Sequence, residues 1–321
     1  MATSTTYKSA IASLPFLPQK VSNMAILAYI AALLACSVLY MNYAMQWYWW
    51  VFGIVEVVCY FYFANRLTKN WAMLKPRTFE RNIFGWAFLI RVIVMLFLYW
   101  FHNEMTGQPF MFHAADAVGY HEEALWIAET IRDGHFQTYL DYKFGPGKGV
   151  SDAGYPMYLG LVYWLSWDSI IFARLLKCLW GALSCLLIYR IGKRNFGEQI
   201  GRVAAILMML ESHFWIYGGM HLKETEMIFV TLLFLERADN LVRNRKFDFR
   251  NIAVVVVLMA SLFTFRTVLG LTGVFALGIA LMLSSQRVIS WGRRVVFLLV
   301  FGATALYFAG GRIFSEIEAV Y

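Results

Sequence analysis

Asp116 is the first candidate for a catalytic residue. It stands in the segment His113-Ala-Ala-Asp116-Ala-Val-Gly-Tyr120, and Tyr120 follows at i+4, on the same face of an expected helix. An aspartate can act as a general base that takes a proton from a hydroxyl group. A carboxylate at the start of a helix can also cap free backbone amides, so both interpretations stay open.

Cationic side chains gather in short segments farther along the chain. His221, Lys223 and Glu224 fall in a very short turn between two apolar runs, and Arg266 and Arg174 each lie near the end of another run. Cations at one interface can hold a phosphate and stabilise the charge that develops on it as a leaving group. The alternative for Lys223 is a side chain that simply reaches from the membrane edge to water.

A third motif, Gly154-Tyr155-Pro156-Met157-Tyr158, opens a shorter apolar stretch at 155–167. Proline in a first helical turn and tyrosine at a membrane interface are both ordinary, so the motif is weak when taken alone. We expect this stretch to form a half-buried or re-entrant helix that presents Tyr155 near the other candidates.

The candidate residues lie within or between long apolar runs of the chain. The chain has 321 residues and is 60% hydrophobic but only 15% charged, which indicates a membrane protein. Runs of the length that a bilayer requires lie at 22–43, 46–65, 83–102, 169–191, 200–219, 226–243, 251–267, 269–285 and 294–310. The expected fold class is all-α: a polytopic membrane protein with about nine transmembrane helices and a large outer loop that carries short juxtamembrane helices.

Loop charge predicts the orientation. Lysine and arginine concentrate in the loops at 66–82, 190–202 and 237–250 and around 287–294, which we therefore place in the cytoplasm. The loop at 103–154 is mainly acidic and should face outward. The formal net charge of +8 then reflects membrane orientation, and we expect no nucleic-acid partner.

Several ionisable residues fall inside the expected spans, where an unpaired charge is costly. Glu56 and Arg91 lie at depths that match within about 2 Å, so we expect them to pair, either as a packing salt bridge or with a catalytic role. Lys177 and Glu211 also lie at similar depths and could pair near the site.

At these residues the sequence resembles the GT-C superfamily of glycosyltransferases. The branch is that of polyprenyl-phosphate-dependent enzymes, which includes protein O-mannosyltransferases and lipid A aminoarabinose transferases. The resemblance runs from about residue 83 to 275. Its elements, in order, are Asp116 with Tyr120 and Ala124, Tyr155 to Tyr158, Ala173-Arg174-Leu-Leu, Gly181-Ala182, Gly192 to Gly197, Val203-Ala-Ala-Ile, and Glu224 or Glu226.

The resemblance implies a transferase that moves a monosaccharide from a polyprenyl-phosphate carrier to a glycan, lipid or protein acceptor. Asp116 would be the catalytic base. The donor phosphate would lie near Lys223, Arg266 and Arg174, and the sugar, the acceptor or a metal near Glu224, His221, His113, Tyr120 and Tyr155. The location implied is a bacterial inner membrane, with the active site facing the periplasm.

The chain also departs from the family pattern. Ala117 follows Asp116 where many members have Asp-Glu, which leaves the metal unknown and a divalent cofactor cation an open question. We expect two accessory helices in residues 1–82, a GT-C-like core at 83–285 that includes the loop at 103–154, and a last helix with an outward tail at 286–321.

Two other functions stay open at this point. One is an envelope-polysaccharide polymerase or ligase with a polyprenyl-diphosphate donor, which would favour several arginines over one aspartate. The other is a non-catalytic GT-C-like scaffold or transport subunit, and a transporter should show broken helices and charges that meet at the midplane.

Overall fold

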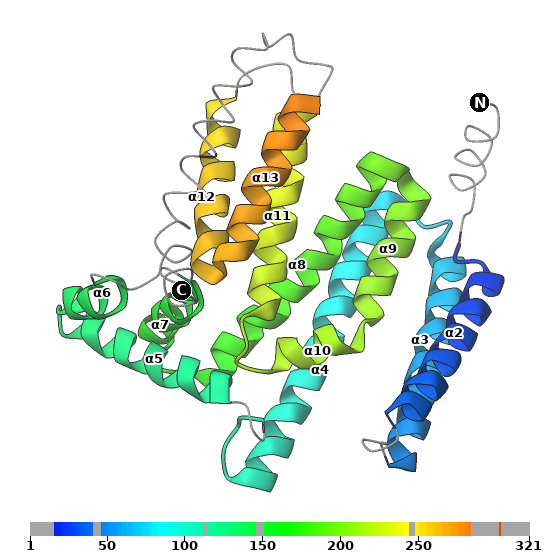
Figure 1. Ribbon diagram of the computed structural model, residues 1–321, viewed down its shortest axis with the longest axis horizontal. Helices are drawn as coiled ribbons and strands as arrows, with labels where there is room; N and C mark the ends of the chain where they lie inside the picture. Colours follow the sequence, from blue (N-terminus) through cyan, green and yellow to red (C-terminus); the bar gives the residue numbers. More distant parts are fainter. Residues whose placement is uncertain are drawn as a thin grey trace. The chain divides into compact units, whose positions relative to one another are not determined.

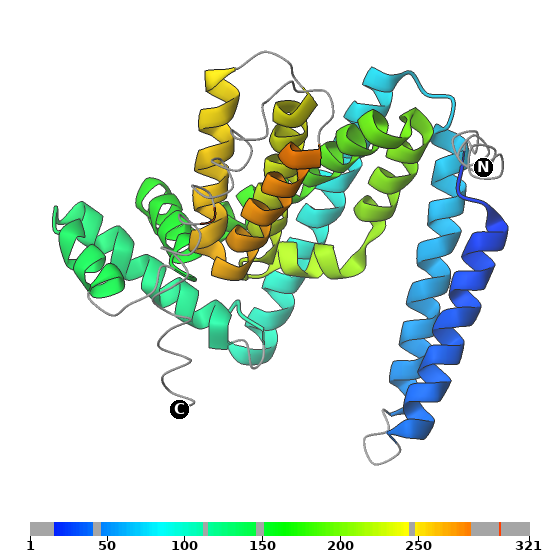
Figure 2. The same cartoon turned by 45° about the horizontal axis from the view of Figure 1, so that its top comes forward.

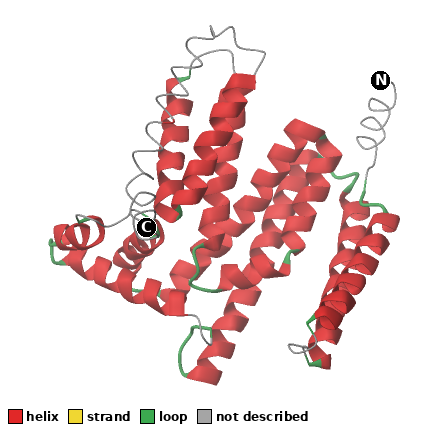
Figure 3. Ribbon diagram, viewed as in Figure 1, coloured by secondary structure: helices red, strands yellow, loops and turns green. Residues whose placement is uncertain are grey.

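The computed structural model describes residues 16–40, 46–111, 115–145, 151–243, 248–283 and residue 302. Every regular element in this part of the chain is a helix, as Figure 3 shows. The all-α class predicted from the sequence is therefore confirmed. Of the span predicted at 294–310, all but residue 302 lies outside the described residues.

Four helices are long and apolar enough to cross a membrane, namely α2 (Gln19–Leu39), α3 (Trp47–Trp71), α4 (Pro76–Thr106) and α8 (Ile170–Phe196). The shortest, α2, has 21 residues and would be about 30 Å long, which matches the hydrocarbon layer of a bilayer. Its apolar side chains are largely exposed, among them Met24, Leu27 and Val38. Exposed apolar surface on such helices is what contact with lipid requires, so the chain is an integral membrane protein.

The second half of the described chain contains α9 (Glu198–Leu210), α10 (Ser212–Gly219), α11 (Glu224–Arg243), α12 (Phe249–Phe265) and α13 (Thr267–Leu283). The last three coincide with predicted spans, although α12 and α13 have only 17 residues each. The prediction of one continuous helix over 200–219 was wrong. The backbone leaves the helical region at Glu211, where ψ is 110°, and a hydropathy window does not register a break at a single residue.

Three shorter helices follow α4 in the chain: α5 (Ala115–Arg132), α6 (Phe136–Phe144) and α7 (Gly154–Ser166). The structure thus has a short helix where the sequence predicts one at 155–167. Trp167 and Asp168 end α7 in the left-handed region, with φ of 54° and 63°. A bidentate ion pair between Asp168 and Arg132 ties this turn to the end of α5, with N–O distances of 2.8 and 2.9 Å.

The chain forms two compact units that alternate along the sequence. Unit 1 comprises Met1–Ile90 and Cys185–Trp215, and unit 2 comprises Arg91–Ser184 and Ile216–Tyr321. The domain boundaries at 82 and 285 stay a prediction. They were drawn from the family resemblance, whereas the two units are defined by contacts within the structure.

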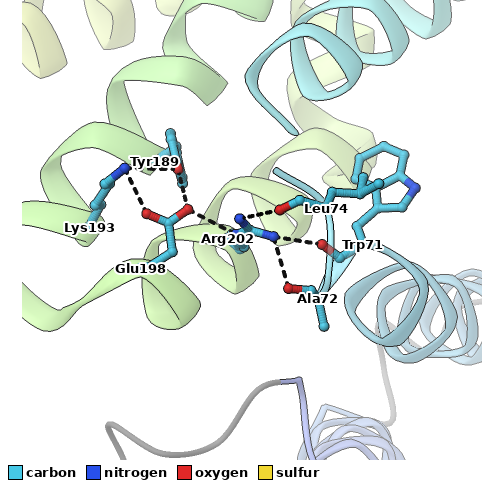
Figure 4. Close-up of polar contacts among 7 residues, drawn as sticks. All are labelled: Trp71, Ala72, Leu74, Tyr189, Lys193, Glu198 and Arg202. Atoms are coloured by element: carbon cyan, nitrogen blue, oxygen red, sulfur yellow. Dashed lines mark hydrogen bonds and ion pairs between the residues drawn. The ribbon is translucent and has the colours of Figure 1, made fainter. Parts of the chain in front are cut away.

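In unit 1, Arg202 of α9 binds the end of α3 (Figure 4). Its guanidinium donates to the carbonyl oxygens of Trp71, Ala72 and Leu74 at 2.8, 3.0 and 2.7 Å, and its Nε donates to Glu198 at 3.0 Å. The last carbonyl groups of a helix have no partner within the helix. Arg202 supplies those partners from α9 and so joins α3 to α9 at this end.

In unit 2, α5 lies across one end of the bundle formed by α11, α12 and α13 and packs along α7 (Figures 1 and 2). Small residues make this contact close. A Cβ atom on Gly160 of α7 would come within 2.5 Å of Ile127 Cγ2 on α5, and Ala124 and Ala128 are fully buried in the same contact. The α5–α7 pair therefore forms a rigid platform for the residues along its edge.

The break between α12 and α13 lies beside the start of α7. Arg266 has an extended backbone there, with φ of −162° and ψ of 117°. Thr264, two residues earlier, packs so closely on Gly154 that no Cβ would fit at that glycine. This contact brings the Arg266 backbone near the segment that contains Asp152 and Tyr155.

Candidate active site

Asp116 lies in the first turn of α5 and is exposed. The free amides and the dipole at this end of a helix favour a negative charge. Residues 112–114, which include the candidate His113, lie outside the described residues, so the capping alternative for Asp116 stays open. Tyr120 follows one turn later and is half-buried.

Lys223 reaches this edge of α5 from the turn between α10 and α11. Its ammonium forms an ion pair with Asp152 Oδ1 and lies 5.7 Å from the centroid of the Tyr120 ring. Burial raises the pKa of Tyr120; Lys223 opposes this, while Asp152 and Asp116 raise the pKa further. Through Tyr120, the structure therefore brings Asp116 and Lys223 into one electrostatic neighbourhood.

Lys177 of α8 lies in a buried layer next to this group. Its Nζ is 3.1 Å from Glu226 Oε2, 3.4 Å from the Tyr155 hydroxyl, and donates to the carbonyl oxygen of Leu222. The sequence allowed a pair between Lys177 and Glu211, and in the structure the anion beside Lys177 is Glu226. At the helix break, the Glu211 carboxylate is 47% exposed and lies 3.3 Å from His213, whereas Glu226 lies in the first turn of α11, beside the Leu222 carbonyl that Lys177 binds.

A chain of four hydrogen-bonded side chains continues the buried layer. His121 Nδ1 lies 2.7 Å from the Tyr163 hydroxyl, which lies 2.7 Å from His221 Nε2, and Arg174 Nε donates to His221 Nδ1 at 3.2 Å. Arg174 also donates to the carbonyl oxygen of Pro109, in the segment between α4 and α5. The chain thus connects α5, α7, α8 and the turn after α10.

The direction of these hydrogen bonds follows from Arg174, which can only donate. His221 Nδ1 must accept, so a neutral His221 carries its hydrogen on Nε2 and donates to Tyr163, which in turn donates to His121 Nδ1. Burial, and secondarily Arg174, hold the pKa of His221 well below its ordinary value. Burial also lowers the pKa of His121, although Glu122 and Asp168 oppose it. Both histidines are therefore neutral at pH 7.

The remaining predicted residues, Glu224, Arg266, Glu56 and Arg91, belong to different elements of the fold. Glu224 is partly buried in the first turn of α11, and its Oε2 has no hydrogen bond within the part of the chain that the structure describes. The Arg266 side chain is exposed. Glu56 accepts a hydrogen bond from Ser212 in unit 1, whereas Arg91 is fully buried against Gly181 in unit 2, so their pairing stays a prediction.

Three residues of this region were missed by the sequence reasoning, namely Asp152, His121 and Tyr163. His121 directly follows Tyr120, and Tyr163 lies eight residues after Tyr155 on one helix, so a weak positional signal existed for these two. Asp152 carried no signal beyond its acidic type, because its partner Lys223 is 71 residues away.

Among the described residues, no three His, Cys, Asp or Glu side chains converge as a metal site would require. Whether the protein needs a metal stays an open question. The acidic groups Asp152 and Glu226 form ion pairs with Lys223 and Lys177.

A model of the Alg9-like mannosyltransferase family matches residues 129–310, more than half of the chain. The chain belongs to this family. It is therefore a glycosyltransferase of the GT-C fold class, which confirms the prediction of the superfamily from the sequence. No curated protein and no solved structure matches the chain.

The matched residues cover only part of the candidate site. It begins near the end of α5 and includes α7, the turn with Lys223, and Arg266, whereas Asp116 and Tyr120 precede it. The family named is a mannosyltransferase family, and the narrower branch of protein O-mannosyltransferases and aminoarabinose transferases is not the one that matches.

Proposed function

We propose that this Alg9-like protein transfers a monosaccharide from a polyprenyl-phosphate carrier to a hydroxyl group of a glycan, lipid or protein acceptor. The family description supports mannose as the sugar. The observation that carries the proposal is the edge of the α5–α7 pair, where the exposed carboxylate of Asp116 neighbours Tyr120 and, through it, the Lys223 ammonium.

The proposed reaction uses these charges in sequence. Asp116 takes the proton of the acceptor hydroxyl, whose oxygen forms a bond to the anomeric carbon of the sugar. The bond from that carbon to the phosphate oxygen breaks, and polyprenyl phosphate leaves with the electron pair. Lys223 and Arg266 stabilise the negative charge that gathers on the phosphate.

The buried layer supports these groups from within the protein. Arg174 is only 1% exposed and has Pro109 and His221 as partners, so we propose that it adds positive charge without direct contact to the phosphate. Lys177 holds the carbonyl of Leu222, the residue before Lys223. We propose that Glu224 and Tyr155 face the sugar or acceptor.

The setting follows from the loop charges and from the lipid carrier. We propose that the site faces the non-cytoplasmic side of a bacterial inner membrane, because the loop with Asp116 is acidic and the flanking loops are basic. At that interface, the isoprenoid tail can stay in the bilayer while the phosphate reaches Lys223.

The test compares wild type with Asp116→Asn for transfer of labelled mannose from polyprenyl phosphate, using full-length protein in lipid nanodiscs. Loss of a general base should lower the rate by about 10²–10⁴-fold. Glu122→Gln is the matched control, because it removes another exposed carboxylate from α5 and should leave the rate unchanged.

Other arms of the same experiment separate the alternatives. A donor panel with one or two phosphates distinguishes this reaction from that of a polymerase or ligase. Loss of activity with a chelator, and its recovery with a divalent cation, would assign a metal. Equal rates for wild type and Asp116→Asn, or no transfer from any donor, would contradict the proposal.

A further inference from the structure

Asp152 has a backbone position that the packing around it determines. Its φ is 64°, in the left-handed region that aspartate and asparagine tolerate better than most residues. Ala153 and Tyr155, which follow it, are fully buried, and Gly154 packs against Thr264. The main chain at Asp152 is therefore held in place, while its side chain remains 45% exposed.

Lys223 is the more buried partner of this ion pair, with 12% of its side chain exposed. Burial alone would lower its pKa, but the interactions with Asp152 and Tyr120 raise it above the ordinary value, so it is fully charged. The second oxygen of Asp152 accepts a hydrogen bond from Ser151 at 3.2 Å. A half-exposed carboxylate thus covers the ammonium assigned above to the donor phosphate.

We propose that Asp152 and the donor phosphate compete for the Lys223 ammonium, so that Asp152 is a positioning residue that keeps Lys223 in place while the site is empty. This inference rests on the proposed function. On donor binding, the carboxylate rotates away and a phosphate oxygen takes its place on Nζ.

The charges favour exchange over simultaneous binding. Two anions on one ammonium would repel each other, and removal of the carboxylate to solvent needs only a side-chain rotation. The Tyr120 ring lies 5.7 Å from the ammonium and does not depend on Asp152 for this position, so it can limit how far the ammonium moves. Lys223 therefore meets the phosphate already extended and charged.

Competition predicts an unusual sign for one substitution. Asp152→Asn keeps the shape and tolerates the same backbone conformation, but it removes the competing charge. Polyprenyl monophosphate without a sugar should then bind more tightly, because it no longer has to break the Asp152–Lys223 ion pair. A partly exposed ion pair contributes up to about 1 kcal/mol, which corresponds to about fivefold in affinity. A residue that only supported Lys223 would give weaker binding when replaced.

Asp168→Asn is the matched control. Asp168 is also a loop aspartate with a positive φ of 63° and a cationic partner, Arg132, but it flanks the other end of α7. It should leave the affinity unchanged. Lys223→Met should weaken binding, and adding Asp152→Asn to it should have no further tightening effect, because the two residues act through one contact.

The measurement is the equilibrium affinity of the full-length protein in nanodiscs for polyprenyl monophosphate. If wild type binds the lipid and Asp152→Asn weakens or does not change the affinity, the exchange is refuted while the proposed function survives. If wild type binds no polyprenyl monophosphate, both are refuted. If Asp152→Asn also tightens binding when Lys223 is replaced by methionine, the exchange is refuted as well, because the effect of Asp152 would then not depend on Lys223.

Discussion

Replacement of Lys177 by methionine should destabilise the protein strongly, because it breaks a buried ion pair at the base of the candidate site. The Lys177 and Glu226 side chains are only 2% and 4% exposed, and their charged atoms lie 3.1 Å apart. The ammonium also holds the Leu222 carbonyl and contacts the Tyr155 hydroxyl. Methionine fills a similar volume, so the loss is mainly polar.

The magnitude follows from the charge that is left behind. Removal of one partner from a buried ion pair costs about 3–5 kcal/mol, because the other charge remains without compensation. Glu226→Gln leaves the Lys177 ammonium in the same position and should cost a similar amount. The double variant contains neither charge, so its destabilisation should fall below the sum of the single effects by about 2 kcal/mol or more.

Thermal unfolding of the four proteins in one detergent measures this coupling. For domains of 150–250 residues, 1 kcal/mol shifts the midpoint by about 2–4 °C, so Lys177→Met should lower it by roughly 10 °C. Arg190→Ala is the control, since its ion pair with Glu80 is 3.9 Å long and exposed and should contribute less than about 1 kcal/mol. Strictly additive single effects would show that Lys177 and Glu226 do not interact, which would contradict this prediction.

Other contacts give three further predictions. Gly160→Leu should lower the unfolding midpoint by overpacking α5 on α7, at about 1–3 kcal/mol; Gly119→Ala, with open space around it, should not, and equal effects would contradict the packing. Arg202→Ala should destabilise by about 1–3 kcal/mol, because partly buried carbonyls at the end of α3 lose their donor; an unchanged midpoint would refute this role. Burial lowers the pKa of His121 in the folded protein below the value of about 6.5 that it has in the unfolded chain. As the pH falls below about 6.5, the unfolded state therefore binds more protons than the folded state, and the free energy of unfolding decreases. His121→Gln should reduce that loss in unfolding scans at neutral and acidic pH, and an identical pH dependence would count against it.

Local spacing explains why part of the site could be predicted. Asp116 and Tyr120 lie four residues apart, and a helix places such residues on one face whatever surrounds it. Apolar runs likewise indicated the long helices, because bilayer thickness sets their length and lipid their composition. Tyr155 was located by its place at the start of a short helix, which the structure contains as α7.

Choice of partner could not be predicted in the same way. Lys177 needs an anion beside it in its buried position. Its depth in the membrane, estimated by counting residues from the end of the span, was compatible with Glu211 and with other acidic residues. One residue of extended backbone at Glu211 interrupts that helix, and the carboxylate of Glu226 takes the place instead. Such a break depends on tertiary contacts, to which a count of residues from a membrane boundary is insensitive.

The buried chain from His121 to Arg174 shows the general difficulty. Its three links join residues 42, 58 and 47 positions apart, and each residue has an ordinary explanation when considered alone. A low-dielectric interior requires that a buried polar group have a partner, but it does not determine which one. Once Arg174 is known to donate to His221, the direction of every other bond in the chain follows. The physics therefore becomes decisive after the fold has brought the residues together, and this is why the arrangement of the candidate site had to come from the structure.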